Sequence, residues 1–196
     1  MSKTFEFWFD VGSPAAYLAW TQLPALQAAT GAQARLRPML LGGVFQATGN
    51  RSPAAIAAKG DYTFTDFGRY ARRYGVPLRR NPHFPINTLT LMRAAAGLQL
   101  HEPARLGAYL DGVFRAIWVD GRNLNEPAET AAAWAAAGFE PQALMALAQA
   151  PDVKAHLKAL TEEAVARGIF GAPSFFVGPD LFWGQDRLDF VKEALS

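Results

Sequence analysis

The sequence predicts an α/β fold: a strand–helix–strand unit at the start, a long helical segment in the middle, and a strand–strand–helix unit at the end. Three observations support this fold class. An aromatic run at 4–10 leads into the helix-start pair Ser13-Pro14, apolar residues between 42 and 168 recur at helical spacing, and short apolar runs return after residue 168. A chain of 196 residues with 51% hydrophobic residues can bury a substantial core.

The opening unit is defined by the local chemistry on both sides of Ser13. Apolar side chains occupy both faces of the first strand, as is typical of a central strand covered by helices, and its aromatic residues are Phe5, Phe7, Trp8 and Phe9. Ser13 is a favoured helix N-cap, and the proline after it suits the first helical position, where the missing N–H has no partner. We expect a helix over 14–30 ending at Gly31, with a kink or local break at Pro24, and a second strand over 34–40.

The middle of the chain, from 42 to 168, is predicted to be all helical. Apolar residues at helical spacing, with Pro, Asn or Asp near several starts, indicate helices over 61–74, 87–100, 103–120, 127–137, 141–150 and 153–167. Two loops are expected inside this segment, at 45–53 and at 79–85.

The closing unit combines a hairpin and a helix. Strands are expected over 174–177 and 181–183 around a Gly-Pro-Asp turn, and a helix over 186–195. This order of elements describes a thioredoxin-like core, formed by 1–41 and 169–196, that is interrupted by an inserted helical domain at 42–168.

The composition excludes several classes of function. The sequence contains no cysteine, so disulfide exchange, thiolate metal sites and cysteine nucleophiles are impossible. The three histidines, at 83, 101 and 156, have no metal-ligand spacing, so no metal site is expected. A net charge of +2 without a long basic run argues against nucleic-acid binding. No apolar window reaches membrane-spanning length and residues 1–5 do not resemble a signal peptide, so we expect a cytoplasmic protein without membrane contacts.

Five short segments resemble those of a known family. FDVGSPAAYLA at 9–19, FGAPSFFV at 170–177 and LFWGQDRL at 181–188 resemble the 2-hydroxychromene-2-carboxylate isomerases and the related kappa-class glutathione transferases, as do GNRSP at 49–53, with a Lys-Gly pair downstream, and NPHFP at 81–85. The resemblance covers the whole chain. It implies a DsbA-like fold and a homodimer. It also implies glutathione-dependent interconversion of 2-hydroxychromene-2-carboxylate and trans-o-hydroxybenzylidenepyruvate, a step of aromatic catabolism.

Ser13 matches the catalytic serine of this family, at the position where DsbA-like oxidases carry the first cysteine of a CxxC motif. The N–H groups of the first helical turn favour an anion, and a hydroxyl that donates to the sulfur of glutathione would favour its thiolate. Ser13 is thus predicted to activate the sulfur of glutathione as the nucleophile. The alternative for an isolated Ser-Pro pair is a plain N-cap without a catalytic role.

The resemblance also implies a set of glutathione-binding residues: Asn50, Lys59, Ala172, Pro173, Gln185 and Asp186. Pro173 matches the proline that is cis in this fold, and the backbone of Ala172 would pair with the cysteinyl part of glutathione. Asp186 would hold the ammonium group of the γ-glutamyl end. Two alternatives stay open: Asp186 also stands where a helix N-cap belongs, and Lys59 fits a solvated surface lysine equally well.

The aromatic substrate carries a carboxylate, so a cationic or amide partner is expected. Arg79, Arg80 and Asn81 are candidates from their loop position, and His83 either lines the substrate pocket or is a structural loop residue. Trp183 is a candidate for the pocket wall. Two other functions remain possible at this level: a kappa-like glutathione transferase or peroxidase, and a DsbA-like binding protein without catalytic activity.

Overall fold

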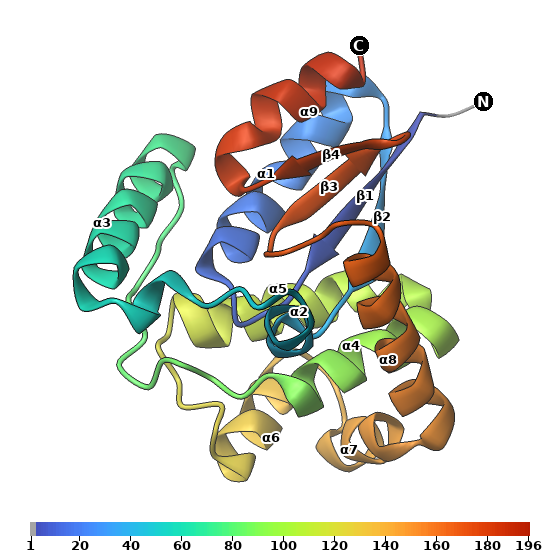
Figure 1. Cartoon of the computed structure of the whole chain (residues 1–196). Coiled ribbons are helices and arrows are strands. Elements are labelled where there is room, and N and C mark those ends of the chain that lie inside the picture. The colour runs from blue at the N-terminus through green and yellow to red at the C-terminus, as the bar shows by residue number, and fades with distance from the viewer. Residues whose placement is uncertain (1–2) are drawn as a thin grey trace.

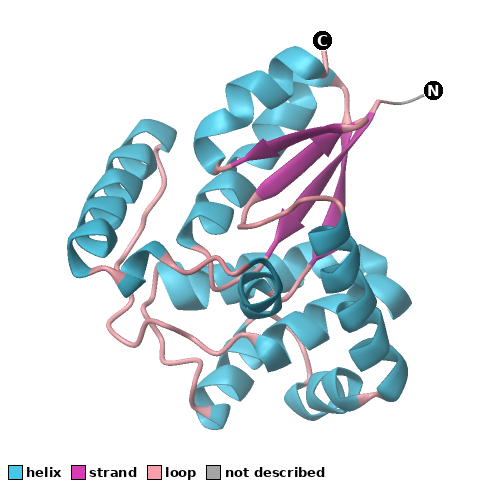
Figure 2. Cartoon of the chain, viewed as in Figure 1, coloured by secondary structure: helices cyan, strands magenta, loops and turns pink. Residues whose placement is uncertain are grey.

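A four-stranded mixed sheet forms the centre of the structure, a computed structural model that describes residues 3–196. The strands are β1 (Thr4–Phe9), β2 (Gln33–Pro38), β3 (Ser174–Val177) and β4 (Asp180–Trp183), in the spatial order β2-β1-β3-β4. β1 pairs in parallel with β2 and antiparallel with β3, and β4 pairs antiparallel with β3 (Figures 1 and 2). The predicted α/β thioredoxin-like core is therefore confirmed, while the first two residues of its N-terminal segment lie outside the described residues.

Helix α1 (Pro14–Thr30) has the bounds that the sequence predicted, with Ser13 as its N-cap and Gly31 as its C-cap. A kink or a local break was expected at Pro24, and the break is wrong, because the helix continues through this residue. A proline inside a helix removes one backbone hydrogen bond, but the neighbouring Leu23 and Leu26 are buried in the core. Burial of these two side chains outweighs that local cost.

The remaining helices confirm the predicted helical middle of the chain. They are α2 (Leu41–Thr48), η1 (Pro53–Ala55), α3 (Ala57–Tyr74), α4 (Leu89–His101), η2 (Pro103–Arg105), α5 (Leu106–Trp118), α6 (Pro127–Ala136), α7 (Pro141–Gln149), α8 (Pro151–Ala166), η3 (Gln185–Arg187) and α9 (Leu188–Ala194). Within residues 3–196, every helix is too short or too polar to cross a bilayer.

Several predicted boundaries are wrong: α3 starts at Ala57 and not at 61, and two further differences lie close to the site. The loop expected over 45–53 starts as helix, because α2 extends to Thr48. This helix is stabilised by the burial of Val44 and by the hydrogen bond that the N–H of Leu41 donates to the carboxylate of Asp10. The closing helix does not start at Asp186: that residue lies in the short 3-10 helix η3, and α9 follows it.

The two faces of the sheet bury different sets of helices. Phe7 of β1 stacks on Phe175 of β3 at 5.4 Å, on the face covered by α1 and α9, and this core continues without interruption into α4, α5 and α6. The opposite face, with Trp8 and Phe176, is covered by α2 and α8. The sheet and the helical segment share one hydrophobic core, so the proposed division at 41/42 and 168/169 remains a prediction.

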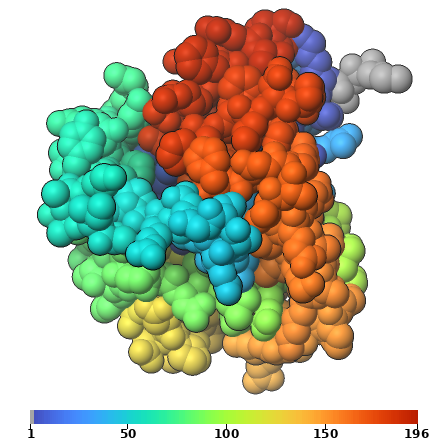
Figure 3. All heavy atoms as spheres, viewed as in Figure 1, coloured from blue at the N-terminus to red at the C-terminus, as the bar shows by residue number. Residues whose placement is uncertain are grey.

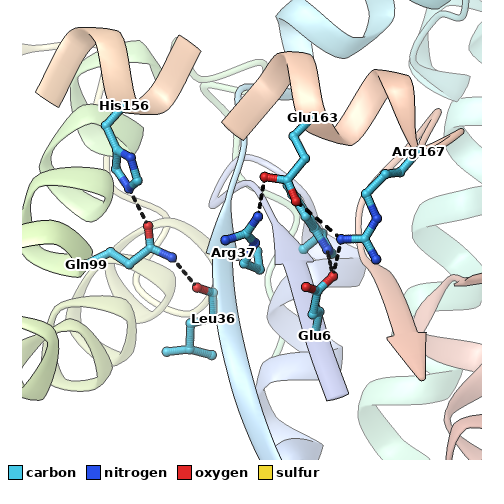
Figure 4. A network of polar contacts seen from close by, with 8 residues as sticks. Glu6, Leu36, Arg37, Gln99, His156, Glu163 and Arg167 are labelled. Atoms are coloured by element: carbon cyan, nitrogen blue, oxygen red, sulfur yellow. Dashed lines mark hydrogen bonds and ion pairs between the residues drawn. The ribbon is translucent and has the colours of Figure 1, made fainter. Parts of the chain in front are cut away.

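An ionic network joins α8 to the sheet (Figure 4). Arg167 pairs with both Glu6 of β1 and Glu163 of its own helix, and Glu163 pairs in turn with Arg37 of β2. The guanidinium carbons of Arg37 and Arg167 lie 4.6 and 5.6 Å from the ring centroid of Trp8. The paired charges are half-buried, which makes this network more effective than isolated surface pairs.

A second polar chain in the same view links α8, α4 and the edge strand. His156 Nε2 lies 2.8 Å from Gln99 Oε1, and Gln99 Nε2 donates to the carbonyl of Leu36 at 2.6 Å. Burial lowers the pKa of His156, and the positive charges of Arg37 and His101 lower it further. His156 is therefore neutral at physiological pH and donates to Gln99.

Candidate active site

Ser13 lies at the junction of β1 and α1 and is 5% exposed. Its Oγ accepts a hydrogen bond from the N–H of Ala16 at 3.2 Å, the interaction of an N-cap, and donates to the carbonyl of Ala172 at 2.9 Å. The Ala172–Pro173 peptide bond is cis, as expected. The first turn of α1 and the cis-proline loop thus meet at one hydroxyl group.

The cis-proline loop is held by hydrogen bonds to four successive carbonyl groups. The donors come from four different elements: Asn50 to Phe170 at 2.8 Å, Ser174 to Gly171 at 2.9 Å, Ser13 to Ala172 at 2.9 Å, and the N–H of Gly184 to Pro173 at 3.0 Å. By contrast, the N–H of Ala172 has no hydrogen-bond partner within residues 3–196. A rigid loop therefore presents the N–H of Ala172 close to Ser13, where the backbone of an extended ligand can bond.

Two aromatic side chains form a rim beside this loop. The rings of Phe170 and Trp183 lie 5.0 Å apart, and the side chain of Trp183 is about half exposed. A Cβ added to Gly171 would lie 2.5 Å from Nε1 of Trp183, so the indole covers a backbone position that only glycine can fill. The role of Trp183 as a pocket wall stays a prediction, and Phe170, which the sequence did not single out, completes the rim.

Gln185 and Asp186 border a groove of about 260 Å³ between α1, α3 and α9. The surface is hollowed at this place, between the teal helix α3 and the red C-terminal helix (Figure 3). The hydroxyl of Tyr74 donates to the carbonyl of the buried Gln185 at 2.9 Å. Burial raises the pKa of Tyr74 to about 12, helped by Tyr70, Asp186 and Asp189, so this donor keeps its proton at physiological pH.

Asp186 is exposed and pairs with the neighbouring Arg187. The alternative of a helix N-cap is wrong for this residue, because it lies within η3 and makes no capping hydrogen bond there. Its carboxylate is therefore accessible at the edge of the groove.

Asn50 reaches the cis-proline loop from the helical segment, in which Lys59 also lies. Asn50 Oδ1 accepts from the N–H of Arg51 at 2.8 Å, and its amide nitrogen reaches the cis-proline loop. Lys59 is exposed in the first turn of α3, where the helix dipole disfavours a cation. A bound anion would relieve that disadvantage.

The predicted substrate-binding loop 79–85 is tied to α5 and to α3, and no hydrogen bond joins it to Ser13 in the part of the chain that the structure describes. The backbone N–H of Arg79 donates to the carbonyl of Trp118 at 2.7 Å, Arg80 pairs with Asp61 at 2.8 Å, and His83 is exposed.

Asn81 is buried in the same loop, with 2% of its surface exposed. Its Nδ2 donates to the carbonyls of Ile117 at 3.0 Å and Arg122 at 2.9 Å, while Oδ1 accepts from the N–H of His83 at 2.8 Å. Both donor hydrogens are used within the protein. We therefore correct the prediction for Asn81: it shapes the loop and does not bind a substrate carboxylate.

Asp10 is the buried polar residue of the site that sequence reasoning missed. It is 1% exposed and accepts hydrogen bonds from the Ser13 turn and from two helical elements. Burial raises its pKa, against the lowering effect of these hydrogen bonds. A signal was present in the sequence: a carboxylate directly after an apolar strand with no basic residue near it.

A thioredoxin-like sheet whose first helix starts opposite a cis-proline defines a thioredoxin-fold protein of the DsbA type, here with serine in place of the redox cysteine. The family model of the DSBA-like thioredoxin domain matches residues 4–196. The chain belongs to this family, and within it to the family of the 2-hydroxychromene-2-carboxylate isomerases, as the following relatives show.

A 2-hydroxychromene-2-carboxylate isomerase of Sphingobium xenophagum is 31% identical over 197 residues, which cover 100% of this chain and 99% of that protein. Glutathione S-transferase kappa 1 of Homo sapiens is 27% identical over 212 residues, covering 100% of this chain and 92% of that protein. Among solved structures, a selenomethionine 2-hydroxychromene-2-carboxylate isomerase has a TM-score of 0.85 at 29% identity, with 98% of this chain and 94% of that chain covered.

Proposed function

We propose that this protein is a glutathione-dependent isomerase that interconverts 2-hydroxychromene-2-carboxylate and trans-o-hydroxybenzylidenepyruvate, or a closely related aromatic carboxylate. One observation carries the proposal: the buried Ser13 hydroxyl stands at the N-terminus of α1 and contacts the residue before a cis-proline, in a chain without cysteine. Such a site can stabilise a sulfur anion but has no thiol of its own, so the sulfur must come from a bound molecule.

The residues around Ser13 fit glutathione. The unpaired N–H of Ala172 can donate to the cysteinyl carbonyl, as the backbone beside a cis-proline does for an extended ligand. The accessible carboxylate of Asp186 suits the γ-glutamyl ammonium group, and Lys59 suits a carboxylate. Asn50 donates to the cis-proline loop and is proposed as a further contact.

Bound glutathione would supply a thiolate that adds reversibly to the conjugated double bond, leaves a rotatable single bond while the electrons rest on the adjacent carbonyl oxygen, and is expelled again. Ser13 then has one task, to donate a hydrogen bond to the sulfur. Its proton must turn away from the carbonyl of Ala172 to do so, while the N–H of Ala16 keeps Oγ in place. The helix N-terminus adds about 0.3–1 kcal/mol of anion stabilisation, rising to about 2 kcal/mol when partly buried.

The substrate is proposed to lie between the cis-proline loop and loop 79–85. The aromatic rim formed by Phe170 and Trp183 offers a surface for the ring. Arg79 and Arg80 are the proposed partners of its carboxylate, and His83 a proposed part of the wall; Arg80 would have to exchange its pairing with Asp61.

Calorimetry of glutathione binding to the wild type and to Ser13→Ala tests the proposal, with the ultraviolet absorbance of the thiolate followed against pH. We expect both proteins to bind, and only the wild type to lower the pKa of the thiol below its ordinary value of about 8.5. Substrate assays would then start from benzylidenepyruvates. Absence of binding to either protein at millimolar glutathione would leave only a DsbA-like binding protein.

A second function, that of a kappa-like glutathione transferase or peroxidase, is supported by the similarity to kappa 1 over the whole chain. Both functions would use the same glutathione site. Turnover of a chlorinated aromatic or of a hydroperoxide, without isomerisation of benzylidenepyruvates, would favour the second function.

A further inference from the structure

Asp10 is a buried carboxylate for which the proposed reaction has no direct use. Its side chain is 1% exposed and bonds only to neutral donors: the N–H of Gly12 at 2.8 Å, the N–H of Leu41 at 2.8 Å and the hydroxyl of Thr88 at 3.0 Å. No cationic side chain bonds to it in the described part of the chain. Burying a carboxylate in this way is costly, which suggests that its contacts are needed.

The turn that carries Ser13 is immobilised by these contacts and by others. Within the turn, Asp10 accepts two hydrogen bonds: Oδ1 accepts from the N–H of Gly12, and the backbone carbonyl accepts from the N–H of Ser13 at 3.0 Å. The residue between Asp10 and Gly12, Val11, accepts from the indole of Trp118 at 2.9 Å. There is no space for adjustment: a Cβ on Gly12 would lie 2.8 Å from a methyl carbon of Thr88.

The two carboxylate oxygens face different parts of the protein. Oδ1 holds the Ser13 turn, whereas Oδ2 holds the first residue of α2 and the residue that precedes α4. α2 leads directly to Asn50, which donates to the carbonyl of Phe170 in the cis-proline loop, whereas Ser13 donates to that of Ala172. One carboxylate thus sets the position of the Ser13 turn relative to the helical segment that supplies the other side of the site.

We propose that Asp10 is a positioning residue for Ser13, which aligns the Ser13 hydroxyl with the sulfur of bound glutathione by clamping the turn 10–13 to the starts of α2 and α4. The inference rests on the proposed function, since it concerns the thiol that Ser13 is proposed to activate. Asp10 itself touches neither the sulfur nor the substrate; it acts through Ser13.

Charge and position have opposite effects on the thiol, and this makes the inference testable. A negative carboxylate close to Ser13 disfavours a second negative charge. If only this electrostatic effect counted, removal of the carboxylate charge would lower the pKa of the thiol. Loss of positioning would raise that pKa, because the Ser13 hydroxyl would donate less well to the sulfur. Asp10→Asn keeps the shape but removes the charge, and whichever way the amide is turned, its NH2 group faces a backbone N–H.

The experiment measures glutathione affinity, the pKa of the bound thiol, and turnover of a benzylidenepyruvate for the wild type, Asp10→Asn, Thr88→Val and Thr130→Val. Thr88→Val removes one hydrogen bond to Asp10 without changing its charge. Thr130→Val is the matched control, since Thr130 is equally buried and donates to the carbonyl of Leu124 at 3.0 Å, away from the site.

We expect Asp10→Asn to raise the pKa of the bound thiol and to lower kcat by at least about tenfold, with a smaller change in affinity. Thr88→Val should also raise the pKa of the bound thiol and should lower kcat by about threefold. Thr130→Val should lower only the stability of the protein. A lowered or unchanged thiol pKa in Asp10→Asn would overturn the inference. If Asp10→Asn does not fold, Thr88→Val provides the test. A thiol pKa and kcat in Thr88→Val that match those of Thr130→Val would overturn the inference. A wild type that binds no glutathione would instead refute the proposed function.

Discussion

Replacing Ser13 with cysteine would place the only thiol of the protein at the N-terminus of α1, because the sequence contains no cysteine. The new sulfur would occupy the position of Oγ, which accepts from the N–H of Ala16 at 3.2 Å and is 5% exposed. The pKa of this thiol then reports directly on whether the site stabilises a sulfur anion. It does so without depending on glutathione affinity.

The expected pKa follows from two opposing effects. The helix N-terminus favours the thiolate by up to about 2 kcal/mol in a partly buried geometry, equivalent to about 1.5 pKa units. Burial and the nearby carboxylate of Asp10 act against it. We expect the helix terminus to dominate, and the pKa of Cys at this position to lie at about 7 to 8, below the ordinary value of about 8.5.

Ultraviolet absorbance of the thiolate against pH, together with the rate of alkylation, measures this pKa. Ser174→Cys is a matched control, because Ser174 is also buried and its hydroxyl also donates to a carbonyl of the cis-proline loop, at 2.9 Å, but it lies in β3 and caps no helix. Its thiol should have a raised pKa. A pKa at or above about 8.5 for the cysteine at position 13 would refute the claim that this helix terminus activates sulfur.

Three further predictions concern other parts of the structure. The pKa of His156 is lowered from 6.5 in the folded protein, so its contribution to stability is fully present above pH 6.5 and is lost as the pH falls through the folded pKa. Urea unfolding at several pH values should therefore show a loss in this range that His156→Gln reduces; equal pH dependence in both proteins would contradict it. Gly171→Ala should displace Trp183, whose Nε1 would lie 2.5 Å from the new methyl group, and lower the free energy of unfolding by about 1 kcal/mol through the lost aromatic contact. A denaturant midpoint equal to that of the wild type would show that the indole does not need this space. Arg80→Gln should raise KM for a carboxylate substrate with little change in kcat, with Asp61→Asn, which removes only the partner of Arg80, as the control. Unchanged kinetics would remove Arg80 from the proposed site.

Much of the fold was predictable because its signals are local. The helix from Pro14 to Thr30 is predicted by a capping serine, a proline at its first position and a glycine at its end, all within one turn of its termini. The hairpin after residue 173 is predicted in the same way by its turn residues. These predictions needed no knowledge of distant contacts.

The errors have the opposite character. Residues 45–48 were expected to be loop, yet they form the second half of α2, which is stabilised by the buried Val44 and by the distant carboxylate of Asp10. Asn81 was expected to bind substrate, yet the carbonyls of residues 117 and 122 engage its amide. In both cases an interaction across the chain overrides the local pattern.

The sequence by itself determined the α/β class, the position of Ser13 at a helix start and the absence of any thiol chemistry belonging to the protein. Only the tertiary structure decided that Ser13 faces the carbonyl of Ala172 and that Asp10 joins residues 12, 41 and 88. The physical reason is one of range. Capping, turn formation and periodic burial act within a few residues and leave a pattern in the sequence. Hydrogen bonds between residues tens of positions apart depend on how packed elements are oriented, which no local pattern specifies.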